Sequence, residues 1–257
     1  MNIMRSSYKK LAEIHSEAMC KHMGQLVDDV WEVVRICSQA IDHCLRMDGV
    51  LNNEKLISML LILRNMVSDC CCCMDALERG HERTIFNNIR MILEDLSCVV
   101  HAKENSRVLE TLLAGDYQAS NSISFLRDKY PTHELHKIYG LLSKLSHHKM
   151  QELVVRQWVN RDGLLSHLKP FDPNRKQAKL NALLMVTHLV RLAGEVAESL
   201  CFNELDQSYF WVDPITQKKN LPVDEIIGEI ATSIATLMRV SKFPSPADES
   251  AVAGSVL

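Results

Sequence analysis

Apolar residues recur every three or four positions along almost the whole chain, which is the period of an amphipathic α-helix. The alternation typical of β-strands is confined to VVRQWV at 154–159 and YFWV at 209–212. This pattern predicts an all-α protein that folds as a helical bundle with additional C-terminal helices.

Turn and capping residues divide the pattern into separate helices. Asp48-Gly49 ends the first helix with a turn, Asn53 is a suitable N-cap for the second, and Gly80 and Gly115 mark two later breaks. The predicted helices cover about 6–47, 53–79, 82–103, 106–114, 116–129, the stretch after Pro131, 175–201 and 222–240.

The domain organisation follows from where this pattern weakens. From 151 to 174 the helical period is lost and the stretch contains Gly163, Pro170 and Pro173, which predicts an irregular connection. No repeat of fixed period and no flexible linker divides the chain. We therefore expect a helical bundle core at 1–150, an irregular connection and C-terminal helices at 151–243 that pack on the same domain, and a disordered tail at 244–257.

Composition narrows the compartment and the partners. The chain has 257 residues, 47% of them hydrophobic, and its formal charge of −3 gives no overall attraction to polyanions. The first residues lack the apolar core of a signal peptide, and the run MLLIL at 59–63 is too short to cross a bilayer. The nine cysteines lack the paired spacing of a secreted disulfide framework. We expect a soluble, cytoplasmic protein with no membrane partner.

Two of the predicted helices carry polar side chains along the margin of their apolar face. On the helix at 82–103 this margin consists of Arg83, Asn87, Arg90, Glu94 and His101. On the helix after Pro131 it consists of His136, Tyr139, Ser143 and His147. If the two helices pack side by side, their margins meet in a pocket that holds Arg90, Glu94, Tyr139, Ser143 and His147.

Such a pocket would have a plausible chemistry. His147 would act as general base or acid, Arg90 would stabilise a phosphate, and Glu94 would orient the imidazole. The residues predicted to bind a ligand around this catalytic group are Arg83, Asn87, His136, Tyr139 and Ser143. In the alternative interpretation, Arg90 and Glu94 form an ordinary surface pair at four-residue spacing and the histidine satisfies a buried carbonyl.

The same residues carry a resemblance to a known family. An arginine and a glutamate four apart in IRMILEDL, followed by the tyrosine, serine and histidine of YGLLSKLSH, resemble the mainly bacterial domain-of-unknown-function family 5677 over about 55–150. Proteins of that family are similar to the HEPN group (higher eukaryotes and prokaryotes nucleotide-binding), which includes ribonucleases and their inactive relatives in toxin and antiphage defence systems. The resemblance implies an HEPN-like up-down helical core in a bacterial protein.

The sequence departs from the HEPN ribonuclease pattern in one respect. Those enzymes carry an arginine followed, after four to six residues, by a histidine on one helix, and His147 has no arginine at that distance upstream. Arg161 with His167 and Arg127 with His133 have the spacing, but Gly163 and Pro131 interrupt the two stretches. The candidate His147 therefore departs from the usual nuclease pattern.

Metal and cofactor sites find little support in the sequence. Consecutive helical residues point about 100° apart, so CCCC at 70–73 cannot form a tetrahedral site alone. Cys70 and Cys73 would need further ligands, for which His43, Cys44 and Cys98 are the nearest candidates. The sequence has no glycine-rich phosphate loop and no dinucleotide fingerprint. We predict neither a bound metal nor a cofactor.

Three functions fit these observations. The first is a sensing or interaction module of a bacterial defence or stress system, which binds a nucleotide, RNA or a protein partner encoded nearby. The second is an RNA-directed hydrolase that uses His147, Arg90 and Glu94. The third is a structural assembly protein, and each of the three is compatible with a homo-oligomer.

Overall fold

The structure is a computed structural model that describes residues 2–129, 135–146, 158–159, 165–166 and 177–202, together with 205, 208–210, 230 and 232. Its helices are α1 (Asn2–Leu45), α2 (Asp48–Leu51), α3 (Glu54–Glu78), α4 (Glu82–Glu104), α5 (Ser106–Leu113), α6 (Ala119–Lys129), α7 (Leu135–Ser146) and α9 (Gln177–Leu200). Two short strands, β1 (Trp158–Val159) and β2 (Leu165–Ser166), pair antiparallel with Trp158 opposite Ser166. The predicted all-α helical bundle is confirmed.

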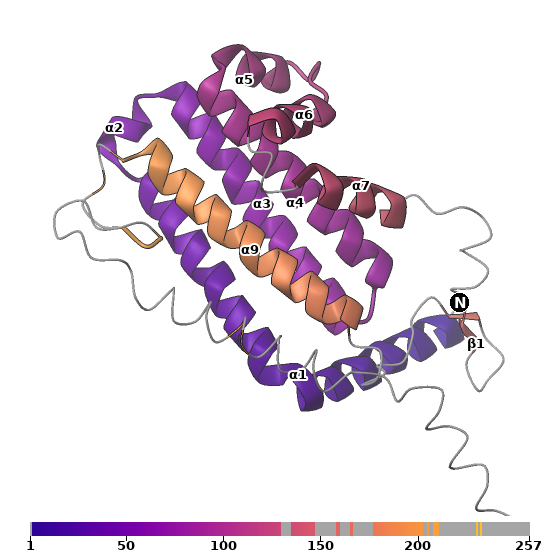
Figure 1. Ribbon diagram of the computed structural model, residues 1–257. Coiled ribbons are helices and arrows are strands. Elements are labelled where there is room, and N and C mark those ends of the chain that lie inside the picture. Colours follow the sequence, from indigo (N-terminus) through magenta and orange to yellow (C-terminus); the bar gives the residue numbers. More distant parts are fainter. Residues whose placement is uncertain are drawn as a thin grey trace, which may run out of the picture.

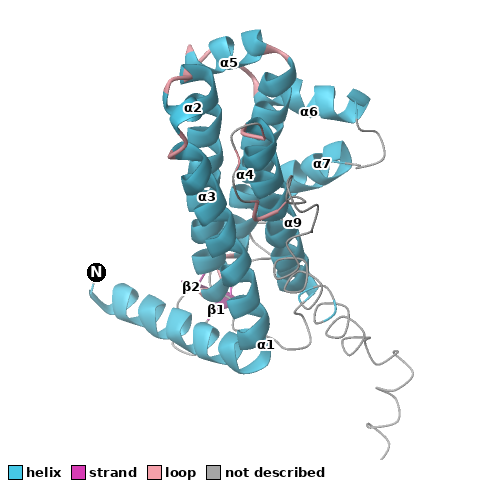
Figure 2. Ribbon diagram, turned by 90° about the vertical axis from the view of Figure 1, so that its left-hand side faces the viewer, coloured by secondary structure: helices cyan, strands magenta, loops and turns pink. Residues whose placement is uncertain are grey.

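The long helices form the body of the bundle. Helices α1, α3, α4 and α9 pack on one another, and α5, α6 and α7 lie against α4 (Figure 1). The N-terminal part of α1 turns away from the axis of the rest of that helix, as the view from the side also shows (Figure 2). The packing of α7 on α4 brings Tyr139, from the polar margin predicted on α7, to Glu94, from the margin predicted on α4.

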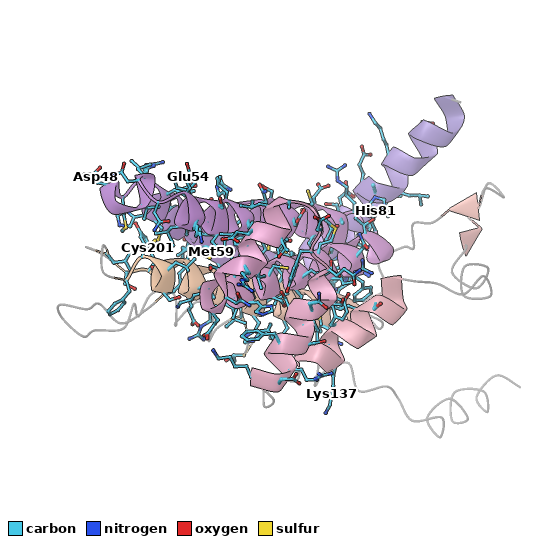
Figure 3. The ribbon with its side chains drawn as sticks, turned by 90° about the horizontal axis from the view of Figure 1, so that it is seen from above. Asp48, Glu54, Met59, His81, Lys137 and Cys201 are labelled. Carbon is cyan, nitrogen blue, oxygen red and sulfur yellow. The ribbon has the colours of Figure 1, made fainter. Side chains whose placement is uncertain are left out.

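One hydrophobic core holds the four long helices together. Each contributes a stripe of fully buried side chains at helical spacing, as the period of the sequence predicts. Examples are Val30, Cys37 and Ile41 of α1, Leu63, Val67 and Cys70 of α3, Ile89, Ile92 and Leu93 of α4, and Leu183, Val186 and Val190 of α9. Side chains from facing helices fill the space between the ribbons (Figure 3).

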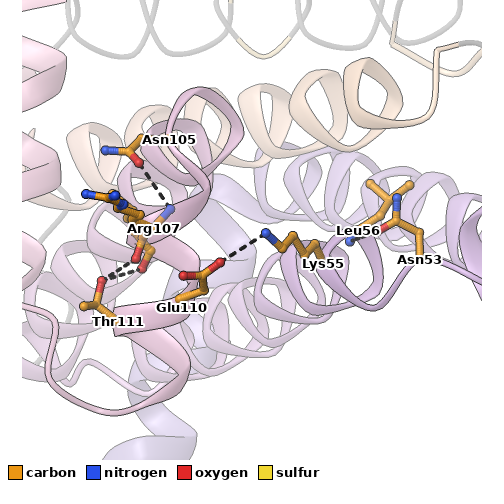
Figure 4. A network of polar contacts seen from close by, with 8 residues as sticks. Asn53, Lys55, Leu56, Asn105, Arg107, Glu110 and Thr111 are labelled. Atoms are coloured by element: carbon orange, nitrogen blue, oxygen red, sulfur yellow. Dashed lines mark hydrogen bonds and ion pairs between the residues drawn. The ribbon is translucent and has the colours of Figure 1, made fainter.

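Asparagine caps start two of the helices (Figure 4). The predicted cap Asn53 accepts a hydrogen bond from the Leu56 amide at 3.1 Å, and Asn105 accepts one from the Arg107 amide at 3.2 Å. Lys55 and Glu110 form an ion pair of 3.2 Å that joins the first turn of α3 to α5. These contacts fix the end of the bundle where α5 folds back.

Some predicted elements differ from the structure. Asp48-Gly49 is not a turn but the start of the short helix α2, whose residue Val50 is buried in the core. Tyr209 and Phe210 of the predicted YFWV strand form a bend. The predicted tail at 244–257, and most of the predicted connection and of the last helix, lie outside the described residues.

Two core helices are also apolar enough to pass for membrane spans. By length and composition, α3 and residues 179–200 of α9 would suffice to cross a bilayer, and 39% and 56% of their most apolar stretches are buried. A core helix of a soluble protein passes the same test. The cytoplasmic location and the absence of a membrane partner therefore stay predictions.

Candidate functional site

The carboxylate of Glu94 joins α4 to α7. The Tyr139 hydroxyl donates a hydrogen bond of 2.9 Å to Glu94 Oε1, and Arg90 Nε lies 3.3 Å from the same oxygen. The Arg90 and Glu94 side chains are 21% and 20% exposed, so this cluster is half-buried but reachable from solvent. The structure thus brings together three of the residues that the polar margins predicted.

The apolar faces of the two helices determine this arrangement. On α4, the buried side chains of Ile89 and Leu93 turn the positions next to them, 90 and 94, to the edge of the core. On α7, the buried side chain of Leu142 leaves Tyr139, one turn earlier, at the corresponding edge. Packing of α7 on α4 then places the tyrosine against the carboxylate.

The Tyr139 hydroxyl and the Arg90 guanidinium lie against the same carboxylate, the first as a hydrogen-bond donor and the second as an ion pair. Burial raises the pKa of the Tyr139 hydroxyl, and its hydrogen bond to Glu94 raises it further. Tyr139 therefore stays protonated at neutral pH and keeps its proton available for Glu94. Because Arg90 lies against the same carboxylate, the charges of the pair compensate each other.

The surroundings of the cluster are acidic. Burial raises the pKa of Asp95 to about 6, and the nearby charges of Asp69 and Glu94 add to the shift. Asp69, on α3, also has a pKa raised by burial. Glu94 and the neighbouring Asp95 oppose the binding of a second anion beside Arg90.

Of the remaining predicted site residues, the structure describes the side chains of Asn87 and Ser143 only, besides that of His101. Asn87 donates a hydrogen bond to the sulfur of Met91 at 3.7 Å, and Ser143 is partly buried on α7. Arg83 and His136 belong to α4 and α7, but their side chains lie outside what the structure describes. His147 also lies outside the described residues, so its role as general base or acid stays a prediction.

His101, the last residue of the polar margin on α4, belongs to a different cluster. Its Nδ1 lies 2.8 Å from the Tyr117 hydroxyl and 3.3 Å from Ser122 Oγ, and its ring stacks on Phe125 at 4.0 Å between centroids. Burial lowers the pKa of His101. Helical spacing did not predict this cluster because Tyr117 lies in the connection before α6.

A cavity of about 400 Å³ between α1 and the end of α3 was also not predicted. It is lined by Lys9, Ala12, Glu13, Ser16, Asp75, Glu78 and Arg79. Three of these residues have partners: Glu78 Oε1 accepts a hydrogen bond of 2.8 Å from the Trp31 indole of α1, and Arg79, the C-cap of α3, pairs with Asp75 at 2.8 Å. The polar groups that α3 and its cap contribute therefore have a structural use.

The cysteines show no arrangement for metal binding in the part of the chain that the structure describes. There, no group of three or more His, Cys, Asp or Glu side chains is placed to hold an ion. Of the CCCC run, Cys70 and Cys73 are buried and Cys72 is exposed, and burial raises the pKa of Cys73 to about 12. These buried thiols pack as small apolar side chains.

Comparison of the chain with models of protein families, with curated proteins and with solved structures finds no match. The resemblance to family 5677 and to HEPN proteins therefore stays a prediction, and the function has to be argued from the site itself.

Proposed function

We propose that the protein is a non-catalytic helical interaction module that binds a protein partner through one face of α4 and α7. This face, called here the α4–α7 patch, consists of Asn87, Arg90, Met91, Glu94 and Tyr139. The observation that carries the proposal is the half-buried contact of Tyr139 and Arg90 with the single carboxylate of Glu94.

The composition of the α4–α7 patch supports binding of a protein. Arginine, methionine and tyrosine are the residue types enriched at protein interfaces. Met91 is 39% exposed although it is a large apolar residue, and it lies one turn before Glu94 on the same face of α4. The patch thus combines an exposed apolar side chain with polar groups held in fixed positions.

Electrostatics disfavour a nucleotide or RNA at this patch. Binding a phosphate would require Arg90 to leave Glu94, and would add an anion beside that carboxylate, which Asp95 follows on α4. Both steps cost free energy that a phosphate contact would have to recover. A partner that donates hydrogen bonds to Glu94, or places a positive charge beside it, does not incur these free-energy costs.

The hydrolase hypothesis requires contacts of Arg90 and Glu94 that differ from those in the structure. It needs Arg90 to bind a phosphate in the transition state and Glu94 to orient His147. In the described residues, Glu94 instead accepts the Tyr139 hydroxyl and pairs with Arg90. A role in bacterial antiphage defence rests on the family resemblance alone.

Site-specific photo-crosslinking tests the proposal. A photoreactive amino acid in place of Met91 is introduced into the full chain in its native cells, with the same residue in place of Leu113, 63% exposed on α5, as the control. We expect a discrete protein adduct from position 91 that is absent from position 113. The adduct should weaken at least fivefold when Glu94→Lys is added, because reversal of the charge disrupts the patch.

Two results would contradict the proposal. Adducts of RNA rather than protein at position 91 would mean that phosphate binding prevails despite the acidic surroundings. Cleavage of RNA by the purified chain, lost in His147→Ala, would favour the hydrolase.

A further inference from the structure

Two thiols meet where α1 and α9 end. Cys44 lies in the last turn of α1 and Cys201 directly follows α9. Both side chains belong to the core that the two packed helices share, and the Cys201 thiol is close enough to perturb the pKa of Cys44. Neither is part of a disulfide, and their exposed fractions are 0% and 2%. The ends of the two helices lie together beside α2, and Cys201 is on the same end of the bundle as Asp48 (Figure 1 and Figure 3).

A short segment from further along the chain is fastened beside these thiols. Glu198, buried one turn before Cys201, accepts hydrogen bonds from Ser208 Oγ at 2.7 Å, from the Tyr209 amide and from the Phe210 amide at 3.0 Å. Residues 208–210 are called here the clasp. Its attachment to α9 rests on one carboxylate with three donors.

The clasp also touches the helix that carries Cys44. The Tyr209 ring contacts the edge of the ring of His43, the neighbour of Cys44, with centroids 6.1 Å apart. The Phe210 ring lies against Gly194, where a β-carbon would come within 2.3 Å of it. The clasp therefore contacts both helices near their ends, at the residue before Cys44 on α1 and one turn before Cys201 on α9.

We propose that Cys44 and Cys201 are a redox modification site, at which a reversible disulfide forms by exchange with a low-molecular-weight disulfide when the clasp opens. The thiolate of Cys44 attacks one sulfur of the reagent, which forms a mixed disulfide and releases one thiolate. The thiolate of Cys201 then attacks the Cys44 sulfur and releases the second. Two protein thiols are oxidised, the reagent is reduced to two thiols, and the two protons pass to the thiolates released.

The surroundings explain why the exchange needs an open clasp. The hydrogen bond to Cys201, burial and the charge of Glu198 raise the pKa of Cys44 well above that of an ordinary thiol. Because the thiolate is the reacting form, the closed state reacts slowly. Opening admits water and the reagent and moves residues 208–210 away.

The bond would join two elements more than 150 positions apart in the sequence. A crosslink that closes so long a loop restricts the unfolded chain strongly, and we expect the oxidised protein to melt about 5–10 °C higher than the reduced one. The disulfide would hold the ends of α1 and α9 together whether or not the clasp is closed.

The test treats the purified, reduced full chain with oxidised glutathione, followed by alkylation and peptide mapping by mass spectrometry. We expect a species that has lost two hydrogens, with one crosslinked pair of peptides that contains Cys44 and Cys201. In Cys44→Ser or Cys201→Ser, the remaining thiol should instead retain a glutathione adduct. Pairing of the exposed Cys20 or Cys72 with either thiol in place of this bond would overturn the proposal.

The role of the clasp is tested with variants that weaken it. Glu198→Gln and the milder Ser208→Ala should speed formation of the disulfide about tenfold, since either removes part of the attachment. Glu195→Gln, on the same helix but paired with Arg191, is the matched control and should leave the rate unchanged. If the Cys44–Cys201 bond forms in neither wild type nor the clasp variants, the proposal is wrong.

Discussion

Asp95 follows Glu94 on α4 and is a half-buried acid whose charge is unfavourable in the folded protein. Burial, then Asp69 and Glu94, raise its pKa from the ordinary value of 3.8 to about 6. The folded state prefers the protonated Asp95 carboxyl to the ionised one. Protonation of this group at low pH therefore stabilises the fold. The advantage is complete below about pH 4 and is lost as the pH rises through about 6.

Replacement of this acid by its neutral analogue should therefore stabilise the protein at neutral pH. We expect Asp95→Asn to raise the free energy of unfolding by about 2 kcal/mol at pH 7 and by almost nothing at pH 4, as measured by urea denaturation. Asp28→Asn, at an exposed position of α1, is the control and should change little at either pH. An equal gain at both pH values would show that charge is not the cause.

At the scale of elements, α3 and α5 end with the same backbone motif but in different surroundings. Gly80 and Gly115 both have φ of 80°, and the amides that follow them, of His81 and Asp116, bond back to carbonyls five residues earlier. A β-carbon on Gly80 would meet the ring of His15 at 2.8 Å, whereas nothing lies within 4 Å of one on Gly115.

This pair of glycines separates backbone strain from a steric clash. Gly115→Ala should cost about 1 kcal/mol of stability from the left-handed conformation alone. Gly80→Ala should cost about 1–2 kcal/mol more, because the buried His15 ring has to move. If both variants lose the same free energy of unfolding in chemical denaturation, the His15 ring on α1 moves aside without cost.

A second pair of glycines compares helix interiors. Gly194 of α9 touches the Phe210 ring, and Gly140 of α7 has nothing within 4 Å of a β-carbon. We expect Gly140→Ala to stabilise the protein by about 0.5–1 kcal/mol and Gly194→Ala to destabilise it by about 1–3 kcal/mol. Hydrogen exchange at the amides of residues 209 and 210 should rise only in the second variant, and unchanged exchange there would refute the contact.

At the scale of the whole molecule, periodicity predicted the helices well because burial of an apolar face fixes each of them. The second predicted helix, 53–79, and its cap Asn53 agree closely with α3. Tyr209 and Phe210 of the predicted YFWV strand form a bend instead, because their amides bond to Glu198, a partner that only the tertiary structure supplies. Trp211 and Val212 lie outside the described residues.

The candidate site was predictable to the same extent and for the same reason. The apolar arcs of α4 and α7 fix their polar margins, so the approach of Tyr139 to Glu94 follows once the helices pack together. Nothing in the spacing indicated that His101 would stack on Phe125, or that Cys44 and Cys201 would meet. The first contact depends on the connection before α6, and the second on the packing of α9 against α1, which is distant in the sequence.

The central claim is that Glu94 joins α4 and α7 into one unit, and a double-mutant cycle tests it most directly. Glu94→Ala, Tyr139→Phe and the double variant are compared with wild type by urea denaturation. We expect a coupling free energy of about 1–2 kcal/mol between positions 94 and 139. In the control cycle, which pairs Glu94→Ala with Tyr117→Phe, the coupling should stay below about 0.5 kcal/mol. Additive losses for Glu94 and Tyr139 would contradict it.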